Sequence, residues 1–484
     1  MSSKRQVAII GAGVSGLAAA SYLCAEGCQV TIYEQKPSAG GLWNRHRSRF
    51  EVEQPVYESL ETNVPRQLMT FSDKKWRADV QLMPHNSSVS EYLQEYELEL
   101  LAKYGNSRGG EETLHIEYNS KVVRVEKLLR NYTAKWGVEA NVAQYDKQKR
   151  TESSYFDAVV VAAGSHQEQY CPIYPGIEDW FKKGPRHLIH SIEFDNPASY
   201  KDKNVLILGY SASGYDISVQ LTPEGVNRAR NVYISTGRPS QPFAPGIRAS
   251  HIMPRPKRFD AATRSVTFVN GATVTDIDSI ILCTGYKYNF DFITTSRNGD
   301  VSPLFPTGPN VNNIYQHIFY ISDNTLAFVG LPTRGASFII AEAQSAVIAR
   351  AFANRLPVIS KTNMQAEYDR WLAEQKNRES QGNGDIQSYH KLGQNADKEY
   401  VNMLCAWAAE VPTIGQSKLP PYWCGCMDTA RQLIGEARAL FKKLSPEEKK
   451  KYPSYESLGF STQKRCTIKH NGGRGVRYAS CYLS

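Results

Sequence analysis

The residues best suited to chemistry lie near the start of the chain, in the run Gly11-Ala12-Gly13-Val14-Ser15-Gly16. Gly11 permits a tight turn, Gly13 lets the backbone approach a pyrophosphate, and Gly16 lets a following helix pack closely on a strand. The start of that helix, where Ser15 lies, offers unpaired N–H groups to phosphate oxygens. Because glycine spacing alone is a weak signal, the neighbouring elements must decide whether this turn binds a dinucleotide.

The elements around the turn complete the pattern. Residues 7–10 are apolar and predict a buried strand, residues 17–23 are rich in Ala and Leu and predict a helix, and residues 29–33 predict a second strand. Glu34 follows, where a carboxylate can accept hydrogen bonds from both ribose hydroxyls and would repel a 2′-phosphate. The segment therefore predicts a site for FAD or NAD rather than NADP.

A second strand–turn–helix unit begins at Lys203. Residues 205–208 predict the strand, Gly209-Tyr210-Ser211-Ala212-Ser213-Gly214 the turn, and residues 216–221 the helix. Ser211 stands where the middle glycine is expected, which weakens the pattern. Its side chain is small, however, and its hydroxyl can donate to a phosphate oxygen.

The strand after this second turn, residues 231–234, is followed by Arg238 and by no acid. A guanidinium without a competing carboxylate favours the 2′-phosphate of NADPH. Arg228 and Arg230 are alternatives for the same role.

Length and composition indicate a folded protein of two or three domains. The 484 residues are 41% hydrophobic and 22% charged, with a net charge of +9. This modest excess suits an anionic cofactor or a membrane surface, and no basic and aromatic cluster indicates nucleic acid. Nine scattered cysteines predict free thiols in a reducing compartment and no metal site. With no signal peptide or membrane-spanning run in sight, we expect a cytoplasmic protein.

Residues 57–71 make the resemblance to a family specific. Their pattern, Tyr-x-x-Leu-x-Thr-Asn-x-Pro-x-x-x-Met-x-Phe, resembles a segment of the flavin-containing monooxygenases at every named position. The resemblance implies that Asn63, which follows Thr62, lies beside the flavin ring and the substrate. Gly40-Gly41-Leu42-Trp43 precedes this segment and is typical of backbone that passes close to a flat ring system.

Further segments resemble the same family. Cys283-Thr284-Gly285-Tyr286 resembles a strand end of its members, and Gln344 corresponds to a residue near the flavin. His190 and Phe194 match the second half of the family identifier, whereas Gly184 lies two residues too far from His190 for the first half. We interpret this departure as a small insertion in the linker.

The resemblance extends to about residue 350 and implies an α/β fold with two Rossmann-like dinucleotide-binding domains. The FAD-binding domain is discontinuous and the NADPH-binding domain is inserted into it. We expect the first part of the FAD domain at 1–169, the NADPH domain at 170–325, and the second part of the FAD domain, with C-terminal helices and a basic tail, at 326–484.

The family chemistry implied is that of a class B flavin monooxygenase, in which NADPH reduces FAD and O2 then forms a C4a-hydroperoxyflavin. A soft nucleophile takes the distal oxygen, and Asn63 is the catalytic residue that holds the nicotinamide or the peroxide. By analogy, we favour an amine or indole alkaloid nitrogen in secondary metabolism, giving a hydroxylamine or nitrone.

Three alternatives stay open. Sulfide S-oxygenation uses the same scaffold, and so does Baeyer–Villiger oxidation of a ketone, against which Phe194 argues because that group has Trp there. The third is an NADPH oxidase or flavin disulfide reductase. A reductase needs a cysteine pair beside the flavin, whereas Cys24 and Cys28 lie on or after the first helix.

The expected partners are a small-molecule substrate and O2, with a homodimer left open. The chain ends in Cys481-Tyr482-Leu483-Ser484, which matches a prenylation box, and basic residues precede it. An ordinary tail is the alternative, so membrane association is expected only if Cys481 is prenylated.

Overall fold

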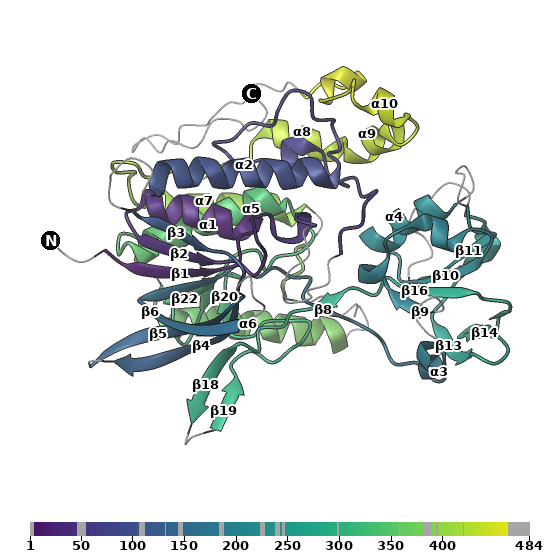
Figure 1. Ribbon diagram of the computed structural model, residues 1–484, viewed down its shortest axis with the longest axis horizontal. Helices are drawn as coiled ribbons and strands as arrows, with labels where there is room; N and C mark the ends of the chain where they lie inside the picture. Colours follow the sequence, from purple (N-terminus) through teal and green to yellow (C-terminus); the bar gives the residue numbers. More distant parts are fainter. Residues whose placement is uncertain are drawn as a thin grey trace. The chain divides into compact units, whose positions relative to one another are not determined.

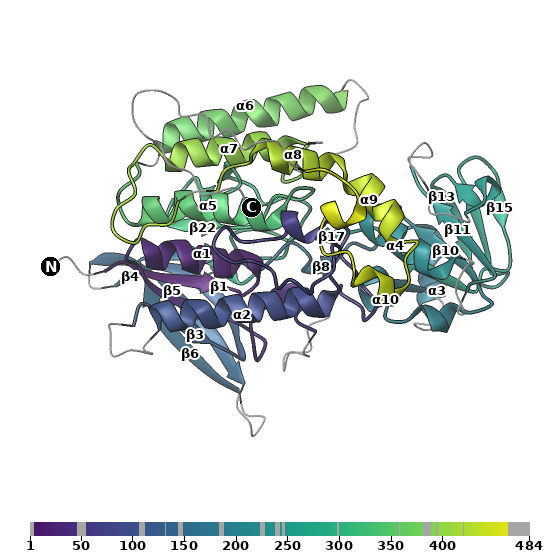
Figure 2. The ribbon, with the colours of Figure 1, turned by 90° about the horizontal axis from the view of Figure 1, so that it is seen from above.

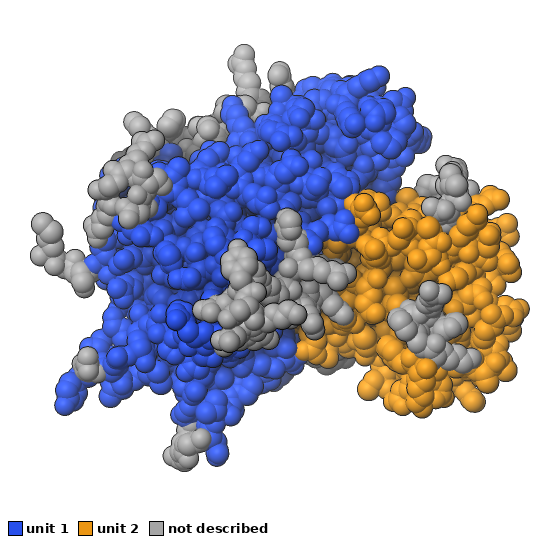
Figure 3. Space-filling view, in the orientation of Figure 1, with its two compact units in different colours: residues 1–52, 61–165, 288–484 blue, residues 53–60, 166–287 orange. Residues whose placement is uncertain are grey.

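The computed structural model divides the chain into two compact units (Figure 3). Unit 1 comprises Met1–Val52, Glu61–Ser165 and Tyr288–Ser484, and unit 2 comprises Glu53–Leu60 and His166–Lys287. The residues that the structure describes are 4–45, 55–105, 112–130, 132–143, 149–182, 188–222, 228–237, 243, 247–297, 300–357, 359–380, 389–393, 395–419 and 421–462.

Unit 1 is built on a seven-stranded sheet with the strand order β20-β21-β22-β7-β1-β2-β3. Its strands are β1 (Gln6–Ile10), β2 (Gln29–Tyr33), β3 (Leu114–Glu117), β7 (Ala158–Val161), β20 (Ile314–Tyr315), β21 (Phe319–Tyr320) and β22 (Leu326–Phe328). The strands from β22 to β3 run parallel. Ile10 pairs with Tyr33, so the carboxyl ends of β1 and β2 lie side by side and bring the first glycine turn next to Glu34.

Helices α1 (Val14–Ala25), α2 (Asn86–Tyr104), α5 (Ser337–Phe352) and α7 (Ala396–Ala408) cover one face of this sheet (Figures 1 and 2). Helix α6 (Lys361–Ser380) packs against the edge strand β20. The remaining helices of unit 1 are α8 (Gly425–Gln432), α9 (Ile434–Phe441) and α10 (Pro446–Lys449). Val7 and Ile9 point to the core under α1, α2 and α5, as alternation along a strand requires. No helix in the described part of the chain is long and apolar enough to cross a membrane.

A second sheet covers the other face, with the order β19-β18-β4-β5-β6. Its strands are β4 (Ser120–Arg130), β5 (Thr133–Ala143), β6 (Lys149–Phe156), β18 (Ile293–Arg297) and β19 (Asp300–Pro303). Ala8 and Ile10 of β1 share a core with Val125 and Trp136 from this sheet. Unit 1 therefore has three layers: helices, a mainly parallel sheet and a mainly antiparallel sheet.

Unit 2 repeats the same plan on a smaller scale, with the sheet order β12-β11-β10-β16-β9 and all strand pairs parallel. The elements are β8 (Glu168–Gln169), α3 (Ile177–Lys182), β9 (Leu188–His190), β10 (Asn204–Leu208), α4 (Ala212–Leu221), β11 (Asn231–Ser235), β12 (Ile252–Met253), β13 (Pro256–Asp260), β14 (Ser265–Phe268), β15 (Thr273–Val274), β16 (Ser279–Leu282) and β17 (Tyr286–Lys287). Val205 and Ile207 face the core that contains α4 residues, whereas Leu206 and Leu208 face the core that contains residues of β13–β15.

The expected α/β fold with Rossmann-like units is confirmed. The domain limits differ from the expected ones, because residues 288–325, assigned to the NADPH domain from sequence, lie in unit 1. Strand pairing explains this: β18 pairs with β4, and β20 and β21 extend the seven-stranded sheet. Cys481 and the rest of the C-terminal tail lie outside the described residues.

Candidate functional site

The first glycine turn is so tight that side chains are excluded at its two ends. Gly11 has φ +103°, and a Cβ there would lie 2.7 Å from the carbonyl oxygen of Ala162. A Cβ on Gly16 would lie 1.9 Å from the carbonyl oxygen of Gly11. α1 begins at Val14, so its free N–H groups stand at this turn, as an anionic pyrophosphate requires.

Glu34 lies beside this turn and is 4% exposed. Its Oε2 accepts a hydrogen bond of 2.8 Å from the N–H of Ala12, and its Oε1 accepts one of 2.9 Å from the N–H of Lys36. Burial raises the pKa of the Glu34 carboxyl, and the two amide donors act in the opposite direction. The carboxylate is thus held at the place where a ribose bound at this turn would need an acceptor.

The Gly40–Trp43 stretch packs directly on the first turn. The N–H of Gly40 donates to the carbonyl of Ala12 at 3.0 Å, and a Cβ on Gly41 would lie 2.9 Å from Cα of Gly13. Residues Gly41–Trp43 form a 3-10 turn in which Leu42 is 38% exposed. The structure therefore brings Gly13 and Gly41 together, as expected for one cofactor-binding surface.

Lys36 fixes this stretch, and sequence reasoning missed it. Its Nζ donates to the carbonyl oxygens of Gly41 and Asn44, both at 2.7 Å, and the side chain is almost fully buried. Burial lowers the pKa of Lys36 to about 8, although the Glu34 charge raises it. A lysine two residues after Glu34 was the available signal, but its carbonyl partners depend on how the loop folds back.

The segment with Asn63 is anchored through its neighbour. The N–H of Thr62 donates to Pro84 O at 2.9 Å, and the Thr62 hydroxyl donates to Val64 O at 2.8 Å. Thr62 is buried and Asn63 is exposed. The backbone is thus held while the Asn63 amide is open to a ligand; the catalytic role of Asn63 stays a prediction.

Gln344 is fully buried, and its amide contacts protein groups. Its Oε1 accepts from the N–H of Gly330 at 2.9 Å, and its Nε2 donates to Tyr400 Oη at 2.9 Å and to His317 O at 3.3 Å. A Cβ on Gly330, which has φ +86°, would lie 2.3 Å from Oγ of Ser15. Gln344 therefore holds Gly330 against the first turn, and a direct cofactor contact stays a prediction.

The second glycine turn has the same hydrogen-bonding plan as the first. The N–H of Gly209 donates to Ser235 O at 2.9 Å, as that of Gly11 donates to Tyr33 O at 2.8 Å. A Cβ on Gly214 would lie 2.3 Å from the carbonyl oxygen of Gly209. Each turn thus sits at the carboxyl end of the first strand of a parallel pair, with a helix start behind it.

The side chains of the second turn divide into two kinds. Ser211 is exposed and does not cap α4 with its hydroxyl, and Ser213 is half-buried. Tyr210 is 7% exposed, and its ring lies in the core of unit 2, where its hydroxyl is 3.3 Å from Oγ of Ser218. Tyr210 can therefore offer a ligand its backbone but not its ring.

The arginines expected for a 2′-phosphate are only partly described. Arg228 and Arg230 are exposed, and Arg238 lies outside the described residues. Gly184 of the linker lies outside them as well. The choice among the three arginines stays a prediction.

His190, which matches the family identifier, is buried, and its contacts among the described residues are with other groups of unit 2. Its Nδ1 accepts from the N–H of Ile192, its Nε2 lies 3.1 Å from Gly285 O, and the N–H of His190 donates to Glu193 Oε1 at 2.9 Å. Burial lowers the pKa of His190 to about 4, so the ring is neutral at pH 7. It ties the end of β9 to the predicted Cys-Thr-Gly-Tyr strand end.

The cysteines considered for a redox pair are buried thiols. Burial raises the pKa of both Cys24 and Cys28, and both have free thiols. A thiol must ionise to act as a redox nucleophile, so these positions do not favour reductase chemistry. Among the described residues, no group of three or more His, Cys, Asp or Glu side chains is arranged to hold a metal ion.

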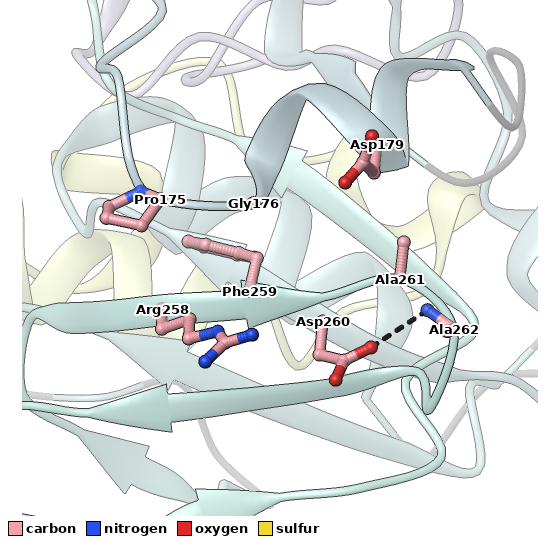
Figure 4. Close-up of a pocket in the computed structure, with 8 residues that line it drawn as sticks. All are labelled: Pro175, Gly176, Asp179, Arg258, Phe259, Asp260, Ala261 and Ala262. Carbon is pink, nitrogen blue, oxygen red and sulfur yellow. Dashed lines mark hydrogen bonds between the residues drawn. The ribbon is translucent and has the colours of Figure 1, made fainter.

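A surface hollow of about 650 Å³ lies in unit 2 between α3 and β13 (Figure 4). It is lined by Pro175, Gly176, Asp179, Arg258, Phe259, Asp260, Ala261 and Ala262. None of the predicted site residues lines it, so it adds nothing to the candidate site.

Comparisons with known proteins agree with this geometry. The family described as FMO-like, flavin-binding monooxygenase-like, matches residues 4–243 and 245–413. Flavin-containing monooxygenase ustF1 of Aspergillus flavus is 29% identical over 93% of this chain and 94% of the relative. Flavin-containing monooxygenase FMO GS-OX2 of Arabidopsis thaliana is 30% identical over 84% of this chain and 85% of the relative. The solved structure of S-allyl-L-cysteine S-oxygenase from Allium sativum is similar, with 27% identity and a TM-score of 0.69 over 94% of this chain and 97% of that one.

Proposed function

The chain belongs to the flavin-binding monooxygenase-like family, and from that premise we propose that it transfers one oxygen atom from O2 to a soft nucleophile on a small molecule. It is a flavin monooxygenase that uses FAD and NADPH. In the proposed reaction, substrate, O2, NADPH and a proton give the oxygenated product, NADP⁺ and water.

The repetition of the glycine turn is the observation that carries this proposal. One chain has two turns with the same amide-to-carbonyl bond, at Gly11 and at Gly209, each backed by a helix start. An acid, Glu34, stands beside the first turn, whereas β11 ends in Ser235 and is followed by Thr236 and Gly237. The first turn therefore suits the ribose of FAD, and the second suits the 2′-phosphate of NADPH.

When bound, FAD supplies the chemistry that activates O2, so the protein needs no strong acid–base pair. The start of α1 binds the pyrophosphate, Glu34 accepts from the ribose, and Lys36 holds the Gly41 loop against the turn. Ser211 donates to a phosphate of NADPH. The amide of Asn63 can donate and accept hydrogen bonds, and it is uncharged and cannot protonate the reacting oxygen. These properties suit a side chain that holds the nicotinamide and shields the reacting oxygen from water.

We favour an amine or indole alkaloid nitrogen as the nucleophile, with a hydroxylamine or nitrone as product. A thioether sulfur is the second candidate, because the similar solved structure is that of an S-oxygenase. Both atoms have an available lone pair that can attack an electrophilic oxygen. We propose that the protein is located in the cytoplasm.

Substrate panels test this proposal. The purified holoenzyme receives NADPH and O2 with secondary amines, with indole alkaloids or with thioethers, while NADPH consumption, H2O2 and product are measured together. We expect one class to raise product and lower the H2O2 formed per NADPH. Full conversion of NADPH into H2O2 with every class would contradict the proposal and favour an oxidase.

A further inference from the structure

The segment 55–60 belongs to a different compact unit from the residues on either side of it. Residues up to Val52 and the stretch Glu61–Ser165 group with unit 1, whereas Glu53–Leu60 group with unit 2 (Figure 3). The segment ends three residues before Asn63 in the chain. We call residues 55–60 the Tyr57 segment.

Tyr57 fastens this segment to unit 2. Its side chain is 6% exposed and lies in the unit 2 core, where its ring meets that of Phe194 edge to face at 5.2 Å. Its hydroxyl donates to the carboxylate of Asp216 and accepts from Nε2 of Gln220 at 2.9 Å. A phenol that donates to a carboxylate in a part-buried position forms a strong, charge-assisted hydrogen bond.

A second hydroxyl of the segment reaches the same helix. Oγ of Ser59 donates to Oε1 of Gln220 at 2.9 Å, and Nε2 of Gln220 also donates to Asp216 at 3.2 Å. Asp216 and Gln220 are four residues apart on α4, so they lie on one face of that helix. The Tyr57 segment therefore follows any shift of α4.

α4 is the helix that starts at the second glycine turn, with Ser211 as its first flanking residue. The ring of Tyr210, inside that turn, lies in the same core as Tyr57, and its hydroxyl contacts Ser218 of α4. A dinucleotide phosphate bound at this turn would accept hydrogen bonds from the N–H groups at the start of α4. The turn, α4 and the Tyr57 segment form one packed body.

The other end of the linkage is the backbone around Asn63. Glu61 accepts from Nζ of Lys449 at 2.7 Å and 2.9 Å, and the N–H of Thr62 donates to Pro84 O. Only Glu61 and Thr62 lie between the end of the Tyr57 segment and Asn63. This short span transmits a displacement of the segment to Asn63 with little slack.

We propose that Tyr57 is a positioning residue that links occupancy of the second glycine turn by NADP(H) to the placement of Asn63. The inference rests on the proposed roles of that turn and of Asn63. Bound nucleotide fixes α4, α4 fixes the Tyr57 segment through Asp216 and Gln220, and the segment fixes Asn63. The link acts through contacts within unit 2 and through the covalent chain.

Hydrogen–deuterium exchange on the FAD-loaded enzyme, with and without saturating NADP⁺, tests the link. Peptides covering 205–221 report on the turn and α4, and peptides covering 61–71 report on the Asn63 backbone. Tyr57→Phe removes the hydroxyl and keeps the ring, and Asp216→Asn weakens the acceptor. Tyr200→Phe is the matched control, because Tyr200 stacks on Phe194 from the same core and its hydroxyl has no hydrogen bond among the described residues.

In the wild type and in Tyr200→Phe, we expect NADP⁺ to slow exchange in both regions. In Tyr57→Phe and Asp216→Asn, we expect slowing at 205–221 to persist while slowing at 61–71 falls about fivefold or more. Equal slowing at 61–71 in wild type and Tyr57→Phe, or none there in the wild type, would overturn the inference. Absence of slowing at 205–221 in the wild type would instead overturn the NADPH site itself.

Turnover provides an independent reading. With a substrate that the wild type oxygenates, Tyr57→Phe should raise the share of NADPH lost as H2O2 about fivefold, at an unchanged KM for NADPH. Unchanged product yield in Tyr57→Phe would contradict the positioning role while leaving the oxygenase function intact. A wild type that forms no product would contradict the proposed function, and the exchange data would still decide the link.

Discussion

Nζ of Lys36 donates to the carbonyl oxygen of Gly41 at 2.7 Å, which holds the Gly41–Trp43 turn onto the first glycine turn. The same ammonium donates to Asn44 O at 2.7 Å, so one buried cation closes the loop at both ends. A Cβ on Gly41 would lie only 2.9 Å from Cα of Gly13, so Gly41 has no room for a side chain on that side. The proposed FAD site is therefore assembled by a residue that need not touch the cofactor.

Replacing this lysine should weaken FAD binding. Lys36→Met keeps the apolar stem and removes the ammonium, so the carbonyl oxygens of Gly41 and Asn44 both lose this donor and the loop is no longer held. We expect the Kd for FAD, measured by flavin fluorescence on the reconstituted apoprotein, to rise at least about tenfold. Lys121→Met, at an exposed lysine of β4, is the control. Equal Kd values for the two variants would exclude the role of Lys36.

A methyl group on the first turn should abolish FAD binding. Gly16→Ala places a Cβ 1.9 Å from the Gly11 carbonyl oxygen, so the turn must open. Gly435→Ala is the matched change, because a Cβ there meets no atom within 4 Å inside α9, and it should stabilise the fold by about 0.5–1 kcal/mol. Flavin content of the purified proteins and their thermal midpoints check both expectations. A Gly16→Ala protein that is purified with bound flavin, and is therefore yellow, would contradict this interpretation of the turn.

His190 should make unit 2 less stable in mild acid. Burial lowers its pKa from 6.5 to about 4 in the folded state, so between these values the unfolded chain binds a proton that the folded chain does not. Stability is therefore complete above pH 6.5 and falls as pH drops toward 4, by about 2 kcal/mol at pH 5. Denaturant unfolding at pH 7 and pH 5 measures this loss.

His190→Asn provides the control for that pH effect. Asn keeps a side-chain acceptor for the N–H of Ile192 but cannot titrate. The variant should lose about 2 kcal/mol less than the wild type between pH 7 and pH 5. An identical loss in both proteins would assign the pH dependence to other groups.

Asn63→Asp should separate oxygen transfer from NADPH consumption. A carboxylate cannot donate a hydrogen bond and adds a negative charge beside the proposed reaction centre, while the size of the side chain is unchanged. We expect product per NADPH to fall at least about tenfold and H2O2 to rise correspondingly, with FAD content unchanged. Oxygenation at the wild-type level would rule out the role of Asn63.

Local sequence patterns were sufficient to predict both glycine turns and their strands. Strand β2 ends at Tyr33 as predicted, and β10 (Asn204–Leu208) includes the predicted strand 205–208. These features depend on residues close together in the chain, where apolar periodicity and glycine conformations are decisive.

Features that depend on distant parts of the chain could not be found in this way. The two partners of Lys36, the hold of Gln344 on Gly330, and the place of residues 288–325 in unit 1 all depend on long-range packing. The Tyr57 segment is the clearest case, since the resemblance assigned a role only to Asn63, and the contacts of Tyr57 and Ser59 with α4 depend on long-range packing.

Isotope transfer from ¹⁸O2 tests the central claim most directly. The holoenzyme is given NADPH, ¹⁸O2 and the substrate class that performs best in the panel, and the product is analysed by mass spectrometry. The account predicts one ¹⁸O atom in each product molecule and one NADPH consumed per product. Product oxygen that comes from water, or ¹⁸O found only in H2O2, would contradict it.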